Sequence, residues 1–145
     1  KVPCLVSQYR YSMFDTAAAG ENFGLAAANG SGITVFSPLA QGLLTDRYLH
    51  GIPAGSRAAR STGFLQMSQV TDDKIAKARR LNELATRRGQ TLAQMALAWI
   101  LTDERVTSVI IGASSVKQLS DNLGAIDSLS FSPEEFSEIR TVLSE

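Results

Sequence analysis

The sequence predicts an α/β fold built on a parallel sheet. Short apolar runs of strand type alternate along the chain with longer segments of helical periodicity, an order that is typical of β-α-β units. No tight hairpin turn joins one apolar run to the next, so neighbouring strands should run in the same direction. The runs are also apolar at successive positions, which favours strands covered on both faces.

The expected strands are three apolar runs, at residues 3–8 (PCLVSQ), 33–37 (ITVFS) and 106–111 (VTSVII). A short helix over 21–29 should separate the first two, because Asn29-Gly30 is a common helix end. Residues 46–70 are polar, rich in Gly and Ser, and without a period. A connection of that length is typical of a binding loop or of a disordered segment.

Two helices should follow that connection. Thr71 is the expected N-cap of the first, with two aspartates in the opening turn, where carboxylates favour the positive end of the helix dipole. Gly89 should end this helix, since glycine tolerates the left-handed conformation found there. The second helix opens with a capping box from Thr91 to Gln94.

The last expected strand is followed by two further helices. A capping box from Ser115 to Gln118 should begin the first of them. The apolar residues expected on its buried face are Leu119, Leu123 and Ile126. The final helix has the clearest start in the chain, FSPEEF at 131–136, with Ser132 as N-cap, a proline at the first helical position and two flanking phenylalanines as a hydrophobic staple.

Composition limits the classes of function. The 145 residues suit one domain, residues 1–145, and 14 acidic residues balance 14 basic ones. A net charge of zero argues against nucleic acid or an anionic membrane as the main partner. No apolar run approaches the ~18 residues that span a bilayer, and no signal-peptide pattern opens the chain. The single cysteine, Cys4, makes no internal disulfide, so the expected location is the reducing cytoplasm.

Each expected strand ends in a polar phrase: Ser7-Gln8 after the first, SPLAQG (37–42) after the second, and GASS (112–115) after the third. The carboxyl ends of parallel strands meet at one edge of a sheet, so these phrases should converge. Pro38 stops further pairing, and Gly42 is small enough to let a ligand approach the backbone amides. The sequence therefore predicts a ligand site at this edge.

The third strand end also predicts an anion site. Gly112 ends the strand, and a helix beginning at Ser114 or Ser115 points free N–H groups toward the same edge. One face of that helix carries the hydrogen-bonding residues Gln118, Asp121 and Asn122. The loop supplies three arginines that can pair with phosphates, Arg47, Arg57 and Arg60. Together these features favour a phosphate-bearing cofactor.

Each feature also has a plainer explanation. A Ser-Pro after a strand is a common turn, loop arginines are usually solvated, and a polar helix face is often simply exposed. His50, the one histidine, has no carboxylate or nucleophile near it in sequence. Only the combination of features favours the cofactor.

Four segments carry a more specific signal: FSPLAQGLLTDRY (36–48), GIPAGSR (51–57), RRGQTLAQMALAWIL (87–101) and TSVIIGASSVKQLSDNLGAI (107–126). In this order they resemble the carboxyl-terminal part of an aldo-keto reductase. The resemblance is closest to the branch that holds bacterial glyceraldehyde-3-phosphate reductases and potassium-channel β subunits. It implies that the chain forms the last three β/α units of a (β/α)₈ TIM barrel.

The resemblance also implies that NADPH binds in extended form at the carboxyl rim. Gln8 would hold the nicotinamide amide, and Phe36 would stack on the nicotinamide ring. The residues implied at the pyrophosphate are Ser37, Pro38, Leu39, Gln41 and Gly42, with Arg47 closing over it. The residues implied at the adenosine are Arg57, Ser114 and Gln118 at the 2′-phosphate and ribose, and Asp121 and Asn122 at the adenine. Gly112 is expected in the same cofactor site.

The family's proton-donating Tyr, its Lys and Asp partners and the substrate-orienting His come from strands earlier than any in this sequence. No catalytic residue is therefore assigned, neither Tyr9 nor Tyr11, and no metal is expected. Three strands of an eight-stranded barrel leave two edges unpaired. The chain is expected to be a fragment of a longer protein, to associate with the missing amino-terminal half or with itself, or to close its edges in some other way.

Three functions remain open at this point. The parent protein would reduce a small carbonyl substrate, an aldehyde or ketone, to an alcohol with NADPH. This chain would supply most of the cofactor site, and alone it would not turn over substrate. The second hypothesis is an NADP(H)-binding regulatory or scaffold module without turnover, and the third is a structural fragment without affinity for a ligand.

Overall fold

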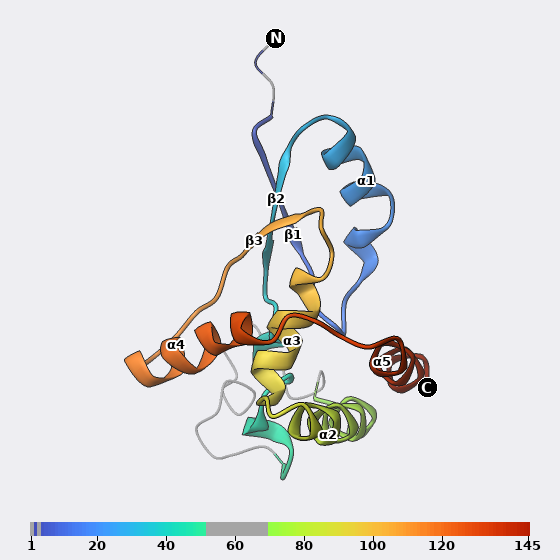
Figure 1. The fold of residues 1–145 in the computed structure, drawn as a ribbon, viewed down its shortest axis with the longest axis vertical. Helices are drawn as coiled ribbons and strands as arrows, with labels where there is room; N and C mark the ends of the chain where they lie inside the picture. Colours follow the sequence, from blue (N-terminus) through green and yellow to red (C-terminus); the bar gives the residue numbers. More distant parts are fainter. Residues whose placement is uncertain (1, 3, 52–69) are drawn as a thin grey trace.

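The structure, a computed structural model, describes residues 2, 4–51 and 70–145. Its strands are β1 (Val6–Arg10), β2 (Gly32–Phe36) and β3 (Val106–Val109), and they form one parallel sheet in the order β1-β2-β3. The helices are α1 (Glu21–Ala28), α2 (Asp72–Arg87), α3 (Leu92–Leu101), α4 (Val116–Leu123) and α5 (Pro133–Ser144). The predicted order of strands and helices and the parallel sheet are confirmed, and Figure 1 shows the arrangement.

The strand boundaries differ from those expected. β1 ends at Arg10, two residues beyond Gln8, because Arg10 still pairs with Phe36 of β2. Tyr9 lies within this extension, and aromatic residues favour strands. β3 ends at Val109 rather than at residue 111. The longer β1 moves the carboxyl edge of the sheet past Gln8.

Only one face of the sheet is covered by the described helices. Ile33 and Val35 of β2 are fully buried and pack with Phe23 of α1 and Ile100 of α3. On the opposite face, the β1 residues Val6, Gln8 and Arg10 are exposed. The expectation that both faces are covered is therefore wrong for the described part of the chain.

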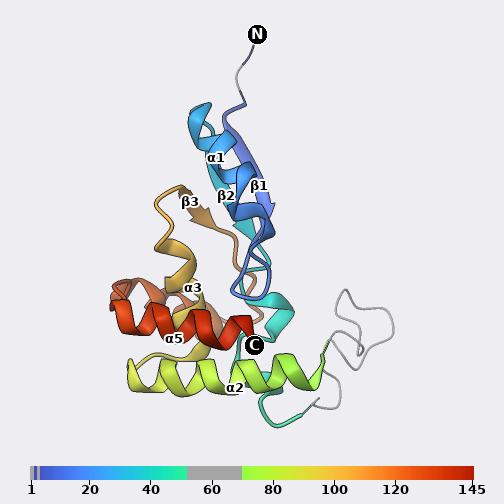
Figure 2. The same ribbon diagram turned by 90° about the vertical axis from the view of Figure 1, so that its right-hand side faces the viewer.

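A second layer lies beyond the carboxyl edge of the sheet. Buried side chains of α2, α3 and α5 form its core, including Leu81, Leu84, Leu92, Met95 and Ile139. Figure 2 shows α2 and α5 lying along each other below the sheet. The helix starts match the sequence: Thr71, Thr91 and Ser132 each accept the N–H three residues on, and the last two form full capping boxes. The Phe131 and Phe136 rings form the predicted staple, 5.3 Å apart.

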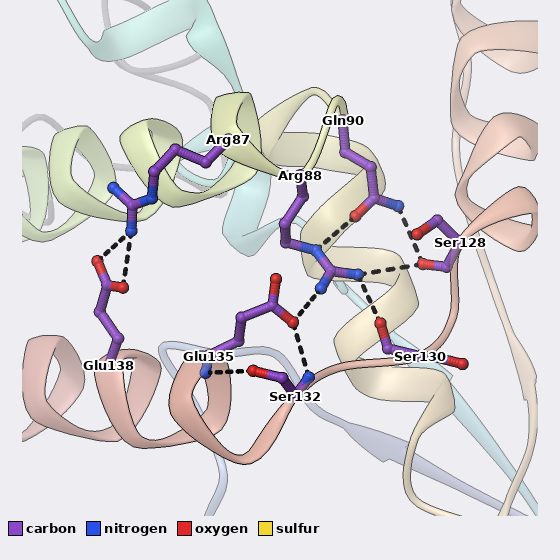
Figure 3. Close-up of polar contacts among 8 residues, drawn as sticks. All are labelled: Arg87, Arg88, Gln90, Ser128, Ser130, Ser132, Glu135 and Glu138. Atoms are coloured by element: carbon purple, nitrogen blue, oxygen red, sulfur yellow. Dashed lines mark hydrogen bonds and ion pairs between the residues drawn. The ribbon is translucent and has the colours of Figure 1, made fainter.

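Arg88 links α2 to the start of α5 (Figure 3). Its side chain is 5% exposed, and Nη1 lies 2.5 Å from a carboxylate oxygen of Glu135. Nη2 donates to the carbonyl oxygens of Ser128 and Ser130, and Nε donates to the side chain of Gln90. One buried guanidinium therefore joins the helix end, the segment before α5 and its first turn.

Helix α4 differs from the prediction in two ways. Ser115 caps it by accepting the N–H of Gln118, but the Gln118 side chain bonds Ser114 instead of completing a capping box. Leu119, Leu123 and Ile126 are 42%, 53% and 62% exposed, so the expected buried face is wrong. Within the described ranges, no other element packs over that face closely enough to bury it.

Neither a membrane-spanning helix nor a group of metal-ligating side chains is found in the described portion. None of its helices is both long and apolar enough to cross a bilayer. No three His, Cys, Asp or Glu side chains there gather as metal ligands would. Cys4 is a free, exposed thiol.

Candidate functional site

The turn after β2 has a strained backbone. Ser37, Ala40 and Gln41 have φ values of 56°, 46° and 61°, and Gly42 has φ 99°. A left-handed conformation costs a non-glycine residue about 1–2 kcal/mol. Such strain clusters at ligand sites and turns, where the surrounding structure holds it in place.

The same turn leaves backbone donors free. The N–H groups of Ala40, Gly42, Leu43 and Leu44 bond carbonyl oxygens within the turn. Those of Ser37, Leu39 and Gln41 have no acceptor among the described residues. Backbone N–H groups without a protein acceptor can donate to an anion, as they do in turns that bind phosphates. This turn is suited to hold a phosphate.

A cleft of about 400 Å³ opens beside the turn. Phe36, Ser37 and Gln41 line one side of it, and the Gln41 side chain donates to the Ser37 hydroxyl at 3.2 Å. Phe36 is 37% exposed, so part of its ring is available for stacking. Of the other residues expected at the pyrophosphate, Pro38 is buried, while Leu39 and Gly42 are half-buried in the turn itself.

Gln8 lies on the open face of the sheet. It is the Cα partner of Thr34, two residues before Phe36, and both strands point toward the turn. Residues paired across parallel strands project to the same face, so Gln8 and Phe36 share that face. The structure brings these two predicted residues onto one surface.

Helix α4 and the residues just before it hold four of the predicted residues. The Gln118 Oε1 accepts from both the N–H and the hydroxyl of Ser114, at 2.8 and 3.0 Å. Asp121 pairs with Lys117 at 2.6 Å. Asn122 is 6% exposed, and its Nδ2 has no hydrogen-bond partner in the described part of the chain. A buried amide without a partner is unusual, because it costs about 1–3 kcal/mol.

Two more of the predicted residues, Gly112 and Arg47, lie at the surface. Gly112 is exposed in the segment between β3 and α4. Arg47 is exposed, and its backbone N–H, not its guanidinium, bonds Thr45. Arg57 and Arg60 lie outside the described residues. Ile110 donates its N–H to Val35, which ties the end of β3 to the end of β2.

Three charged residues of the cleft were missed by the sequence: Arg10, Asp15 and Lys74. Arg10 was missed because β1 was expected to end at Gln8. Lys74 comes from α2, and no local pattern indicates that the first turn of a distant helix meets the end of β2. The tyrosines at 9 and 11 were the available signal for the longer strand, since both favour β structure.

Tyr11 is poorly suited to donate a proton. Burial raises its pKa to about 12, and the Asp103 carboxylate adds to the effect. Its ring stacks on Trp99, with centroids 5.6 Å apart, on the covered side of the sheet. A general acid works best with a pKa near the working pH, so this phenol is not a candidate.

Comparisons with known proteins show the family of this chain. The model of the Aldo/keto reductase family matches residues 1–144. The chain is 44% identical over 145 residues to L-glyceraldehyde 3-phosphate reductase of Escherichia coli O157:H7, covering 96% of this chain and 41% of that protein. A probable voltage-gated potassium channel subunit beta of Oryza sativa is 36% identical over 143 residues, covering 96% of this chain and 44% of the relative.

A solved structure has the same fold. Aldo-keto reductase AKR11C1 from Bacillus halodurans, in its holo form, superposes with a TM-score of 0.69 at 24% identity, covering 95% of this chain and 42% of that one. The chain thus spans less than half the length of each of these relatives. Its parallel strands and flanking helices form part of a (β/α)₈ barrel. With the family match extending over residues 1–144, this chain belongs to the aldo/keto reductase family.

Proposed function

We propose that this chain is the cofactor-binding part of an NADPH-dependent reductase that converts small aldehydes or ketones to alcohols. The observation that supports it best is the strained turn at 37–42, whose free N–H groups lie beside the half-exposed ring of Phe36. That combination suits a dinucleotide, which has both a pyrophosphate and a flat ring.

The proposed contacts follow the order of the strands. Phe36 stacks on the nicotinamide, and Gln8, on the same face, bonds its carboxamide. The turn residues Ser37, Pro38, Leu39, Gln41 and Gly42 line the pyrophosphate, and Arg47 pairs with it. NADPH, once bound, supplies the hydride.

The adenosine end of the cofactor is assigned to the segment after β3. Ser114 and Gln118, with Arg57, meet the 2′-phosphate and ribose, and Asp121 and Asn122 meet the adenine beside Gly112. The exposure of Ser114 and Asp121 supports this assignment, because their polar side chains are accessible to a ligand.

The proton donor is proposed to lie outside this chain. Tyr11, which lies on the covered side of the sheet with its pKa raised to about 12, is poorly suited to that role. The open face of the sheet and the exposed apolar face of α4 are the surfaces that further β/α units would cover. We therefore expect the chain to bind NADPH without turnover. The cytoplasm supplies NADPH and suits the free thiol of Cys4.

A regulatory or scaffold module is the second candidate. The relative from Oryza sativa is named as a channel subunit, and its similarity extends over 96% of this chain. In that case NADPH would bind at the same turn, but its binding would report cofactor level to a partner protein.

A fluorescence titration of the purified chain with NADPH tests the cofactor site. We expect saturable binding, and we expect Gln118→Ala to weaken NADPH more than NADH, because only NADPH has the 2′-phosphate. Ser120→Ala, an exposed change on the same helix, is the matched control and should leave both affinities unchanged. No binding by the wild-type chain would reject the proposal, and equal losses for both cofactors would reject the 2′-phosphate assignment.

A further inference from the structure

Arg10 lies next to Phe36 on the open face of the sheet. It is the last residue of β1, Phe36 is the last residue of β2, and the two are Cα partners. Their side chains therefore project to the same face, and both line the cleft of about 400 Å³. The Arg10 side chain is 57% exposed, so its guanidinium is accessible to a ligand there.

The Arg10 guanidinium is held in place from one side. Its Nε lies 3.2 Å from a carboxylate oxygen of Asp15. Asp15 is fixed in turn, because its backbone N–H and carbonyl bond those of Ser12, each at 3.0 Å. Asp15 is the one ionic partner of Arg10 within the ranges described. An arginine held at Nε still presents its terminal amino groups, which bind phosphates and carboxylates in a two-pronged manner.

The described residues that line the cleft carry a net positive charge. Its lining includes two cations, Arg10 and Lys74, and one carboxylate, Asp15, which gives a net charge of +1. Partly desolvated walls strengthen the field of such a charge compared with bulk water. An anionic ligand is therefore favoured over a neutral one of the same size.

The sheet order separates Arg10 from the adenosine end of the cofactor. β2 is the central strand, with β3 and α4 on one side and β1 on the other. Arg10 on β1 thus lies across Phe36 from the helix assigned to the adenosine. Arg10 is therefore next to the position proposed for the nicotinamide ring, which the carbonyl to be reduced must approach.

We propose that Arg10 recognises an anionic group, a phosphate or a carboxylate, on the carbonyl substrate, and so selects charged aldehydes or ketones over neutral ones. This inference rests on the proposed function, because it uses the position assigned to the nicotinamide. Arg10 is a specificity-determining residue in this account. The oxyanion that binds the Arg10 guanidinium could belong to the substrate or to the pyrophosphate of the cofactor. The experiment below separates these two sources.

The test is a ¹H–¹⁵N NMR titration of the full 145-residue chain, saturated with NADP⁺, using glycerol 3-phosphate and its uncharged counterpart glycerol as probes. We expect glycerol 3-phosphate to shift the Arg10 Nε–H signal and to bind about ten-fold more tightly than glycerol. Arg10→Gln should remove that preference while leaving the NADPH affinity within about two-fold. Arg105→Gln is the matched control, since Arg105 also pairs with an aspartate, Asp103, but lies outside this cleft.

Asp15→Asn tests the same site in the opposite direction. Removing the carboxylate raises the net charge of the cleft, so glycerol 3-phosphate should bind about two- to five-fold more tightly. No gain in this variant would overturn the proposal, even if Arg10→Gln failed to fold. A loss of NADPH affinity in Arg10→Gln would also overturn it and assign the guanidinium to the pyrophosphate. Absence of NADPH binding by the wild-type chain is a separate result, which would reject the proposed function itself.

Discussion

At the scale of single residues, removing the Arg88 side chain should lower the free energy of unfolding. Its guanidinium is 5% exposed, pairs with Glu135 and satisfies the carbonyl oxygens of Ser128 and Ser130. Arg88→Met would remove the cation paired with that carboxylate and would leave the Ser130 carbonyl oxygen without its donor. Breaking a buried pair in this way costs about 3–5 kcal/mol, so we expect the free energy of unfolding, measured by urea denaturation, to fall by about 3 kcal/mol.

The neighbouring arginine provides the control for this prediction. Arg87 pairs with Glu138 at 2.6 Å on the same pair of helices, but the two side chains are 55% and 44% exposed (Figure 3). Solvent-exposed pairs contribute about 0–1 kcal/mol. Arg87→Met should therefore change the unfolding midpoint only slightly. Equal losses in the two variants would show that burial of Arg88 is not what matters.

We expect Tyr11 to make the free energy of unfolding depend on pH above the physiological range. Burial raises its pKa in the folded chain to about 12, against an ordinary value of 10.0. The unfolded chain loses this proton first, so the stabilisation is complete below pH 10 and is lost as the pH rises through 12. Urea denaturation between pH 9 and about 12 should show stability falling with pH in the wild type. Tyr11→Phe should reduce that slope, and an unchanged slope would contradict the assignment.

The charged residues of the cleft show where reasoning from sequence fails at this scale. Phe36, Ser37 and Gln41 were found because they follow one strand in a recognisable phrase. Arg10 and Lys74 belong to the same cleft but to different elements, and only the strand register and the packing of α2 bring them there. Local sequence patterns do not predict such long-range contacts.

At the scale of elements, helix starts were predicted well because their causes are local. The side chains of Thr71, Thr91 and Ser132 each bond an N–H only three residues away. Strand ends were predicted less well, because pairing with the neighbouring strand determines them. For example, β1 continues to Arg10 because Arg10 pairs with Phe36. The buried face predicted for α4 was wrong, because periodicity cannot say whether anything covers a face: Leu119 and Leu123 are exposed, and Ile126 lies beyond the end of the helix.

The start of α5 allows a test of one local signal. Ser132 accepts the N–H of Glu135, and the Glu135 carboxylate accepts the N–H of Ser132 in return. Ser132→Ala removes half of this capping box and should lower the free energy of unfolding by about 1 kcal/mol in urea denaturation. Ser137→Ala, in the exposed interior of the same helix, should leave it unchanged or raise it slightly. A loss in Ser137→Ala as large as in Ser132→Ala would rule out capping as the cause.

At the scale of the whole molecule, the chain combines a well-packed layer of helices with surfaces that lack a cover. The apolar residues of α4, Val116, Leu119 and Leu123, are 85%, 42% and 53% exposed, and Ile110 at the open face of the sheet is 46% exposed. Exposed apolar surface of this kind drives association in water. In the complete barrel we propose that further β/α units cover it.

The purified chain should therefore associate with itself as its concentration rises. Sedimentation velocity should give a mass above 15.6 kDa that falls toward that value on dilution. Replacing Leu119 and Leu123 together by Lys should shift the equilibrium to the monomer with little change in the far-ultraviolet circular dichroism, since both side chains already face solvent. Ser120→Lys adds a charge to the same helix without removing apolar surface and should leave association unchanged. A wild-type chain that stays monomeric at every concentration would mean that the exposed leucines do not hold copies together, and that the open surfaces are tolerated in water.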